Sequence, residues 1–277
     1  MSPFRQHFTR RQILRLGTAA FFASLLGPRR MGAAYSAALP KKASKNAFQF
    51  IVVNDTHYTE AECGVWLGKA VTQMKSHRAD FCVIAGDLSE NGRSDQLAGV
   101  CDVFKKLQMP VHKIIGNHDY LSDNNRQPFT DICGPELNYQ FSHKGWQFVA
   151  LDSTEGTHAY RTRIQPETFT WLDRNLPTMS KTRPTVLFTH FPLGKNITRP
   201  TNSDELLARF EPFQLREVFN GHWHGISEST WRDTPIVTDR CCSRLRENRD
   251  GSKEKGYFLC QADSGKVTKS FIPVTPA

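Results

Sequence analysis

The sequence predicts an α/β fold in which buried strands alternate with amphipathic helices. Short apolar segments rich in β-branched residues, such as 48–54 and 80–85, recur along the chain and indicate strands. Segments with apolar residues at helical spacing, such as 94–107, lie between them. Near-continuous apolar strands separated by helices are typical of parallel sheets that are covered on both faces. The 277 residues are enough for one sizeable core, so we expect one large domain.

Local patterns justify each predicted element. Leu97, Val100 and Phe104 recur at helical spacing, and Ser94 is expected to cap this helix. Pro166 suits the first turn of a later helix. In chain order we predict strands at 48–54, 80–85, 111–115, 146–151, 185–189, 218–220, 236–238, 257–262 and 267–272, and helices at 63–77, 94–107 and 166–176.

The first 38 residues predict an export signal. Basic residues precede an apolar segment at 16–27 that is too short to span a bilayer, and small residues follow near 35–38. The pair Arg10 and Arg11 resembles a twin-arginine (Tat) signal, which implies a bacterial precursor that meets the Tat machinery and a periplasmic or secreted product. We expect a signal peptide at 1–38, a linker at 39–47 and a folded domain at 48–277. The alternative is an uncleaved leader that anchors the protein to a membrane.

The positive charge of the chain is concentrated in the predicted leader. The chain carries 36 basic and 27 acidic residues, but residues 1–45 hold nine of the basic residues and no acidic one. Loss of 1–38 would leave a formal charge of +3 instead of +9. Because no long basic segment follows the linker, stable nucleic-acid binding is not expected. The oligomeric state is not predicted.

Seven cysteines leave at least one unpaired within the chain. C-x-x-C spacing does not occur, which argues against a zinc knuckle or a thioredoxin-like site. We expect Cys82 and Cys260 to be small core residues, because they lie inside apolar segments. The adjacent Cys241 and Cys242 are either two buried thiols or partners in separate bridges.

Metal-capable side chains follow five predicted strands. Ligands in open α/β sheets bind beyond the carboxyl ends of the strands, so these side chains are expected to share one edge. Each motif alone is compatible with a polar turn, but the set and its order are not expected by chance. In chain order the motifs are D-x-H with Asp55 and His57, G-D with Asp87, G-N-H-D with Asn117, His118 and Asp119, T-H-F-P with His190, and G-H-x-H with His222 and His224.

This ordered set resembles the calcineurin-like metallophosphoesterases over essentially the whole predicted domain. The resemblance implies two packed β-sheets flanked by helices, with a two-metal centre at the strand ends. It implies that Asp55, His57 and His224 hold one metal, that Asn117, His190 and His222 hold the other, and that Asp87 bridges them. It also implies that His118 contacts the substrate and assists the leaving group, with Asp119 orienting it, and that a metal-bridging hydroxide is the nucleophile.

The residue types suit that chemistry. Four imidazoles, two carboxylates and an amide favour Mn, Fe, Zn or Co over Ca. Two divalent ions with two aspartates and a hydroxide keep a charge of about +1, which suits an anionic phosphate ester. The Tyr that binds ferric iron in purple acid phosphatases is replaced here by Glu90, which argues against ferric phenolate chemistry. The G-D-L-S-x-x-G segment is closer to the phosphodiesterases of the family, including those that cleave cyclic nucleotides or glycerophosphodiesters.

We therefore expect an exported dinuclear phosphoric ester hydrolase, a phosphodiesterase acting on a small phosphate ester. Two divalent metal ions are the expected cofactors. The rival hypotheses are a phosphomonoesterase or nuclease of the same fold and a binding protein without turnover. A degenerate binding protein would be expected to lack ligands, whereas all seven positions are filled here.

Overall fold

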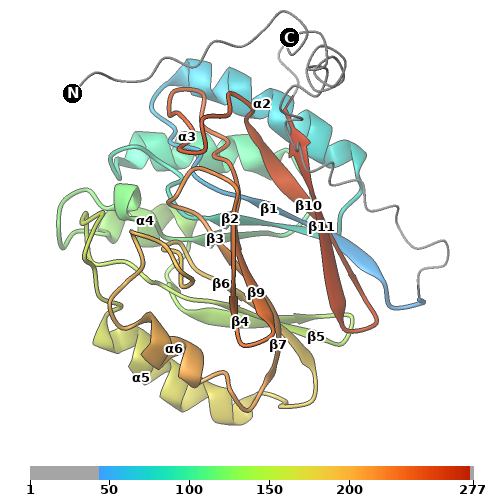
Figure 1. Ribbon diagram of the computed structural model, residues 1–277. Coiled ribbons are helices and arrows are strands. Elements are labelled where there is room, and N and C mark those ends of the chain that lie inside the picture. The colour runs from blue at the N-terminus through green and yellow to red at the C-terminus, as the bar shows by residue number, and fades with distance from the viewer. Residues whose placement is uncertain (1–43, 275–277) are drawn as a thin grey trace, which may run out of the picture. The chain divides into compact units, whose positions relative to one another are not determined.

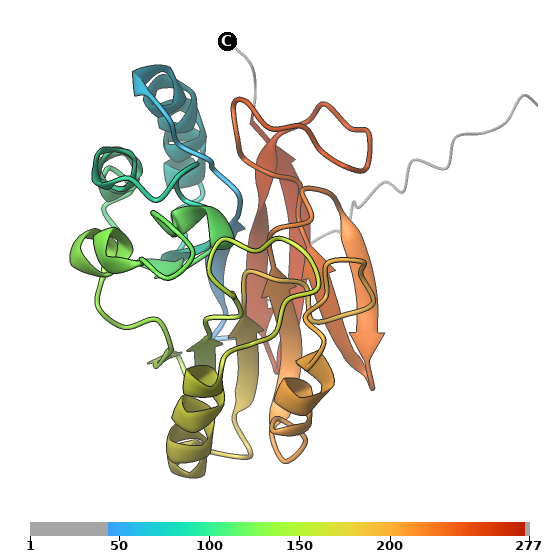
Figure 2. The same ribbon diagram turned by 90° about the vertical axis from the view of Figure 1, so that its left-hand side faces the viewer.

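The computed structural model describes residues 44–274 of the chain. The predicted signal peptide at 1–38 lies outside the described residues, as does most of the predicted linker. Two β-sheets pack face to face, with helices on both outer faces (Figures 1 and 2). This arrangement confirms the predicted fold class.

The described part of the chain contains eleven strands and seven helical segments. The strands are β1 (Phe48–Val53), β2 (Phe81–Ala85), β3 (Val111–Ile114), β4 (Tyr139–His143), β5 (Trp146–Ala150), β6 (Pro184–Phe188), β7 (Gln214–Asn220), β8 (Ser227–Trp231), β9 (Thr234–Thr238), β10 (Gly256–Asp263) and β11 (Lys266–Pro273). The helices are α2 (Ala61–Ser76), α3 (Ser94–Lys105), α4 (Gln127–Cys133), α5 (Pro166–Asn175) and α6 (Ser203–Ala208), with 3-10 turns η1 (Asn117–Asp119) and η2 (Leu176–Thr178).

Both sheets are mixed, with parallel strands at their centres. One sheet has the order β11-β10-β1-β2-β3 and the other β4-β5-β6-β7-β9-β8. β1, β2 and β3 are mutually parallel, as are β5, β6, β7 and β9, while β4, β8, β10 and β11 pair antiparallel. In each sheet, therefore, the carboxyl ends of the parallel strands share one edge.

The alternation of side chains along β1 builds two layers of the core. Phe50 and Val52 pack between the two sheets, whereas Ile51 and Val53 pack beneath α2 and α3. Between the sheets the packing is largely aromatic, and the ring of Phe50 lies 6.0 Å from that of Phe219 at 90°. Full burial of each such side chain contributes roughly 1.5–3 kcal/mol. A third apolar layer lies under α5 and α6, on the outer face of the six-stranded sheet.

The structure corrects several local predictions. Ser94 is the first residue of α3 rather than its cap, because Arg93 takes the N-cap position. The short α4 and α6 and the strands β4 and β8 were not predicted. β4 and β8 are edge strands whose side chains are half-buried or exposed in alternation, so they lack the continuous apolar pattern of the central strands.

The cysteines lie within the described residues and are free thiols. Cys82 and Cys260 are fully buried in the core, as predicted. Cys241 and Cys242 are also fully buried, which favours the interpretation of two buried thiols. Within 44–274, no helix is long and apolar enough to cross a membrane.

Candidate metal centre

The fold brings the predicted ligands together at the carboxyl ends of strands from both sheets. Asp55 and His57 follow β1, Asp87 follows β2, and Asn117 opens η1 after β3. From the other sheet, His190 follows β6, and the G-H-x-H segment follows β7. Two groups of candidate ligand atoms share one carboxylate, which is that of Asp87.

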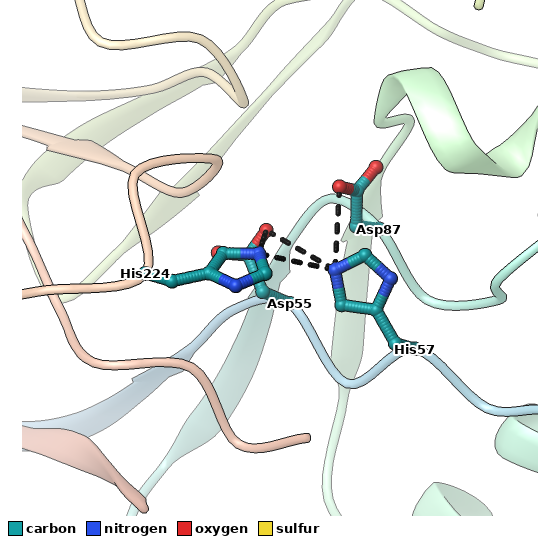
Figure 3. Close-up of side chains that lie close together, drawn as sticks. All are labelled: Asp55, His57, Asp87 and His224. Carbon is teal, nitrogen blue, oxygen red and sulfur yellow. Dashed lines mark hydrogen bonds and ion pairs between the residues drawn. The ribbon is translucent and has the colours of Figure 1, made fainter. Parts of the chain in front are cut away.

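The first group contains Asp55, His57, Asp87 and His224 (Figure 3). Nε2 of His224 lies 3.2 Å from Oδ1 of Asp55 and 3.1 Å from Nε2 of His57. Nε2 of His57 in turn lies 3.6 Å from Oδ2 of Asp87. Two carboxylates and two imidazole nitrogens therefore converge on one small volume, and they are all buried or nearly so.

The second group contains Asp87, His190 and His222. Nε2 of His190 lies 3.3 Å from Oδ2 of Asp87 and 3.2 Å from Oδ1 of Asn117. The amide oxygen of Asn117 thus completes this group. Six of the seven residues predicted to bind metal belong to these two groups, which share Asp87, and the seventh, Asn117, contacts His190 of the second.

The other ring nitrogen of each histidine in these groups faces an oxygen acceptor. Histidines that bind metals usually donate their second N–H to such an acceptor, which fixes the tautomer and the orientation of the ring. The hydrogen-bond acceptors are the Ala85 carbonyl for Nδ1 of His190 (3.0 Å), the Ala159 carbonyl for Nε2 of His222 (3.0 Å) and the Glu247 carbonyl for Nδ1 of His224 (3.4 Å). Nδ1 of His57 lies 2.9 Å from the Glu90 carboxylate, but without the geometry of a hydrogen bond. The residues present therefore fit a pair of divalent ions bound through the remaining nitrogens.

The charges within the site are strongly coupled. Burial opposes the protonated form of His190 and His224, but Asp87 raises the pKa of His190 to about 9 and Asp55 raises that of His224 to about 10. Burial favours the neutral form of Asp55, but His224 lowers its pKa to about 2. Burial and the neighbouring His190 lower the pKa of His222 to about 3. In the metal-free protein, protons on two imidazoles thus balance the buried carboxylates, and these are protons that divalent ions would replace.

The backbone at the site is held in an uncommon conformation. Few residues other than glycine adopt positive φ, and such residues cluster at functional sites, where the surrounding structure enforces them. Five of the seven predicted ligands do so, namely Asp55, His57, Asp87, His222 and His224, with φ of 54°, 44°, 50°, 64° and 49°. The sharp turn after each strand directs these side chains into the site.

Gly116 lets the backbone of the η1 turn approach Asp87. A Cβ on Gly116 would lie 2.1 Å from Oδ1 of Asp87 and 2.3 Å from its backbone nitrogen. The φ of Gly116 is −110°, which any residue adopts. Gly116 is therefore required for close packing and not for an unusual turn.

The chain matches the model of the calcineurin-like phosphoesterase family over residues 48–225. It belongs to that family. Among curated proteins, it is 32% identical over 167 residues to a probable cyclic nucleotide phosphodiesterase of Synechococcus sp., a match that covers 54% of this chain and 60% of the relative. It is 29% identical over 213 residues to a glycerophosphodiester phosphodiesterase of Enterobacter lignolyticus, covering 67% and 74%. The match thus spans about three fifths of the first relative's length.

Solved structures share the calcineurin-like fold at low sequence identity. A dimetal phosphatase of Danio rerio superposes with a TM-score of 0.60 at 16% identity, covering 82% of this chain and 99% of that one. A purple acid phosphatase of yellow lupin gives 0.61 at 13% identity, covering 85% and 52%. At such identities these likenesses concern the fold alone.

His118 and Asp119 follow Asn117 directly, but their side chains lie in different surroundings. The side chain of His118 is 29% exposed, whereas that of His57 is 1% exposed. The carboxylate of Asp119 is fully buried and accepts hydrogen bonds from the backbone N–H groups of Gly116 and Ser89, at 2.9 and 2.8 Å. Burial and the nearby Asp87 raise the pKa of Asp119 to about 7.

None of the described hydrogen bonds of the Asp119 carboxylate goes to the His118 imidazole, and its orienting role stays a prediction. Nδ1 of His118 lies 2.9 Å from the carbonyl oxygen of Glu90 and 3.6 Å from its carboxylate. Asp119 instead connects the loop after β2 to the loop after β3 through backbone hydrogen bonds. Glu90, rather than Asp119, is the acidic residue beside the His118 imidazole.

Glu90 is the site residue that sequence reasoning missed. Its carboxylate contacts His57, His118 and Arg246, the last through both Nε and Nη2. Burial would raise the pKa of Glu90, but His57 and Arg246 lower it to about 2, so the carboxylate is ionised at neutral pH. Glu90 lies three residues after Asp87, and this closeness to a predicted ligand could have marked it as a site residue. Arg246 lies 156 positions from Glu90, and nothing in the local sequence indicates that the two residues pair.

Proposed function

We propose that this protein is a dinuclear metal-dependent phosphodiesterase that hydrolyses small phosphate esters. The observation that carries the proposal is the sharing of Asp87 by two groups of ligand atoms, each with its imidazole rings oriented by a second acceptor. One metal ion would be held by Asp55, His57 and His224 together with Asp87. The other would be held by Asn117, His190 and His222 together with Asp87.

Two divalent ions bound there would polarise the phosphoryl oxygens and lower the pKa of the attacking water. The protein ligands only partly neutralise the charge of two divalent ions. Asp55 and Asp87 contribute two negative charges, while Asn117 and the metal-bound histidines are neutral ligands. The centre therefore stays positive and attracts an anionic ester.

His118 is the residue we assign to the leaving group. Its partial exposure places it where a substrate can reach it, and its Nδ1 is paired with Glu90, which leaves Nε2 available. A proton on Nε2 can be donated to the oxygen that leaves phosphorus, a role that typically contributes about 10²–10⁴-fold to the rate. Glu90 positions this imidazole and that of His57.

A diester substrate is favoured over a monoester by two observations. The relatives with the clearest similarity are named as cyclic nucleotide and glycerophosphodiester phosphodiesterases. In addition, the G-D-L-S-x-x-G segment carries Glu90, paired with Arg246, where a purple acid phosphatase would carry the iron-binding Tyr.

We also propose export of the precursor through the twin-arginine route, from the pattern of residues 1–38. A protein that binds its metals while folding would suit a route that carries folded chains. Cell fractionation and N-terminal sequencing of the product test this. An intact leader on a membrane-bound product would instead support the anchored alternative.

The proposed activity is tested by metal analysis of the purified protein together with rates on three substrates. We expect two divalent ions per chain and faster hydrolysis of bis-p-nitrophenyl phosphate or cyclic AMP than of p-nitrophenyl phosphate. His118→Ala should retain the metal and lose roughly 10²–10⁴-fold in kcat, whereas Asp87→Ala should lose metal and activity together. His77→Gln is the control, because His77 ends α2 and pairs with Tyr257.

The outcome distinguishes the rival hypotheses. Preference for p-nitrophenyl phosphate would indicate a phosphomonoesterase. No turnover of any substrate by metal-loaded protein would indicate a binding protein. Full diesterase activity in Asp87→Ala would refute the assignment of the metal centre.

A further inference from the structure

Two cysteines on neighbouring helices lie in direct contact. Sγ of Cys101 in α3 is 3.5 Å from Sγ of Cys133, the last residue of α4. This is the one cysteine–cysteine hydrogen-bonding contact in the described part of the chain. We propose that Cys101 and Cys133 form a disulfide that closes a ring around the segment carrying Asn117 and His118.

The geometry requires only a small adjustment. Bonded sulfurs lie about 2.05 Å apart, so the two atoms, now 3.5 Å apart, must approach by roughly 1.5 Å. The two thiols point at each other across packed helices. A bond there would leave five free thiols, consistent with the odd cysteine count.

Other cysteines in the described chain have different surroundings. Sγ of Cys63 contacts the Thr59 hydroxyl at 3.3 Å, and Sγ of Cys241 contacts Nζ of Lys255 at 3.1 Å. Cys82 and Cys260 are fully buried in the core, where a small oxidant has no access. The selectivity for one pair therefore follows from contact and from access together.

Access also sets the order of the chemical steps. Cys133 is half-buried, whereas Cys101 is 8% exposed, so a dissolved disulfide such as glutathione disulfide reaches Cys133 first. The hydrogen bond with Cys101 and burial raise the pKa of the Cys133 thiol, so Cys133 must first lose its proton before it displaces one glutathione and forms a mixed disulfide, which makes this the slower step. Sγ of Cys101 then attacks Sγ of Cys133 and displaces the second glutathione. Two protein thiols and one glutathione disulfide thus give one protein disulfide and two glutathione thiols.

The electrostatics around Cys101 assist the second step. In the reduced protein the hydrogen bond with Cys133 lowers the pKa of Cys101; this bond is lost once Cys133 forms the mixed disulfide, but the nearby Lys113 and Lys105 still lower the pKa of Cys101. A larger thiolate fraction at neutral pH speeds the attack.

The disulfide would restrain the loop that carries one ligand of the second metal group, Asn117, and the neighbouring His118. The ring from 101 to 133 contains β3 and η1, and therefore Asn117 and His118. Closing a loop of this length reduces the entropy of the unfolded chain. We expect oxidation to raise Tm by roughly 5–10 °C for a domain of this size.

Thiol mapping of the full-length protein tests the proposal without any assumption about its activity. The purified protein is equilibrated in glutathione buffers from fully reduced to strongly oxidised, quenched with acid, denatured, alkylated and analysed by mass spectrometry without reduction. We expect two alkylatable thiols to disappear on oxidation and a single cross-linked peptide to join Cys101 to Cys133. Differential scanning calorimetry of the two forms measures the change in Tm.

Two variants sharpen the result. Cys101→Ser should show no change in Tm on oxidation, whereas the control Cys63→Ser should behave like the wild type. Seven alkylatable thiols in the oxidised wild type, a mixed disulfide that persists on Cys133, or a cross-link between other cysteines would each overturn the proposal. Because the peptide map uses the wild type, poor folding of a variant would not obscure the answer.

Discussion

Replacement of Glu90 by Gln tests how far one carboxylate organises the candidate metal centre. Glu90 lies 2.9 Å from Nδ1 of His57 and 3.6 Å from Nδ1 of His118, and it pairs with Arg246 at the outer side. Gln keeps the shape of the side chain but removes the negative charge that all three partners face. Arg246 would then stand unpaired beside a site that must accept two divalent ions.

The expected loss can be estimated from these contacts. A hydrogen bond to a charged group contributes about 1.5–3 kcal/mol, which corresponds to roughly 10–150-fold in an equilibrium constant. Loss of the partner of a metal-binding histidine typically lowers metal affinity or activity by about 10–100-fold. Because His118 hydrogen-bonds the Glu90 backbone carbonyl, which Gln keeps, the substitution acts mainly through His57, and we expect a loss of about 10–100-fold in kcat/KM. The loss should appear mainly as weaker metal binding, through His57, with a smaller fall in kcat because only the 3.6 Å charge contact with His118 is removed.

Two measurements separate these effects. Competition with a chromophoric chelator gives the metal affinity, and hydrolysis of bis-p-nitrophenyl phosphate at saturating metal gives kcat. Arg246→Gln is the matched control, because it removes the outer partner and keeps the carboxylate, and we expect it to cost less than about tenfold. If Glu90→Gln stays within about twofold of the wild type in both assays, the assigned positioning role is wrong.

Gly116→Ala should displace Asp87 and abolish metal binding, because the added Cβ would lie 2.1 Å from Oδ1 of Asp87. Metal analysis checks this, with Gly68→Ala as the control that should keep both ions, because a Cβ there meets nothing within 4 Å. Burial raises the pKa of Glu217 to about 7 even with Lys269 at 2.8 Å. Lys269→Met should therefore destabilise the fold little at pH 6 and increasingly toward pH 9, because the Glu217 carboxyl without its partner resists ionisation. The free energy of unfolding should fall relative to the wild type by up to about 1.4 kcal/mol per pH unit. Urea denaturation at several pH values measures this, and a loss of stability that does not depend on pH would contradict the prediction. Metal binding at pH 7 should release two or more protons, because the two ligand imidazoles with pKa values of about 9 and about 10 are protonated without metal, and binding should weaken as the pH falls. Titration calorimetry in buffers of different ionisation enthalpy counts these protons, and heats that do not depend on the buffer would speak against the charge balance.

Local sequence was sufficient for much of the fold and for identifying candidate metal ligands. The central strands are recognisable because both of their faces are buried, which demands continuous apolar residues such as those of β1 and β2. The ligands are recognisable because each motif sits within a few residues of a strand end. Parallel strands carry their ends to a common edge, so adjacency in space follows from topology even without coordinates.

The edge elements were less accessible to such reasoning. β4 and β8 are only partly buried, and α4 and α6 span seven and six residues, too few for a clear helical period. Their existence depends on packing against neighbours that the local sequence does not specify.

The contacts between the motifs and distant parts of the chain were decided by the tertiary structure. The sequence by itself determined the family motifs, and it predicted seven candidate ligands and the residue expected to face the substrate. Only the packing of the two sheets, and of the loop after β9 against the loop after β2, decided that Arg246 pairs with Glu90, that Ala159 orients His222, and that Cys101 meets Cys133. The physical reason is distance along the chain. A strand-end motif is read within a few residues, whereas each of these contacts joins segments at least 32 positions apart, which only the folded backbone brings together.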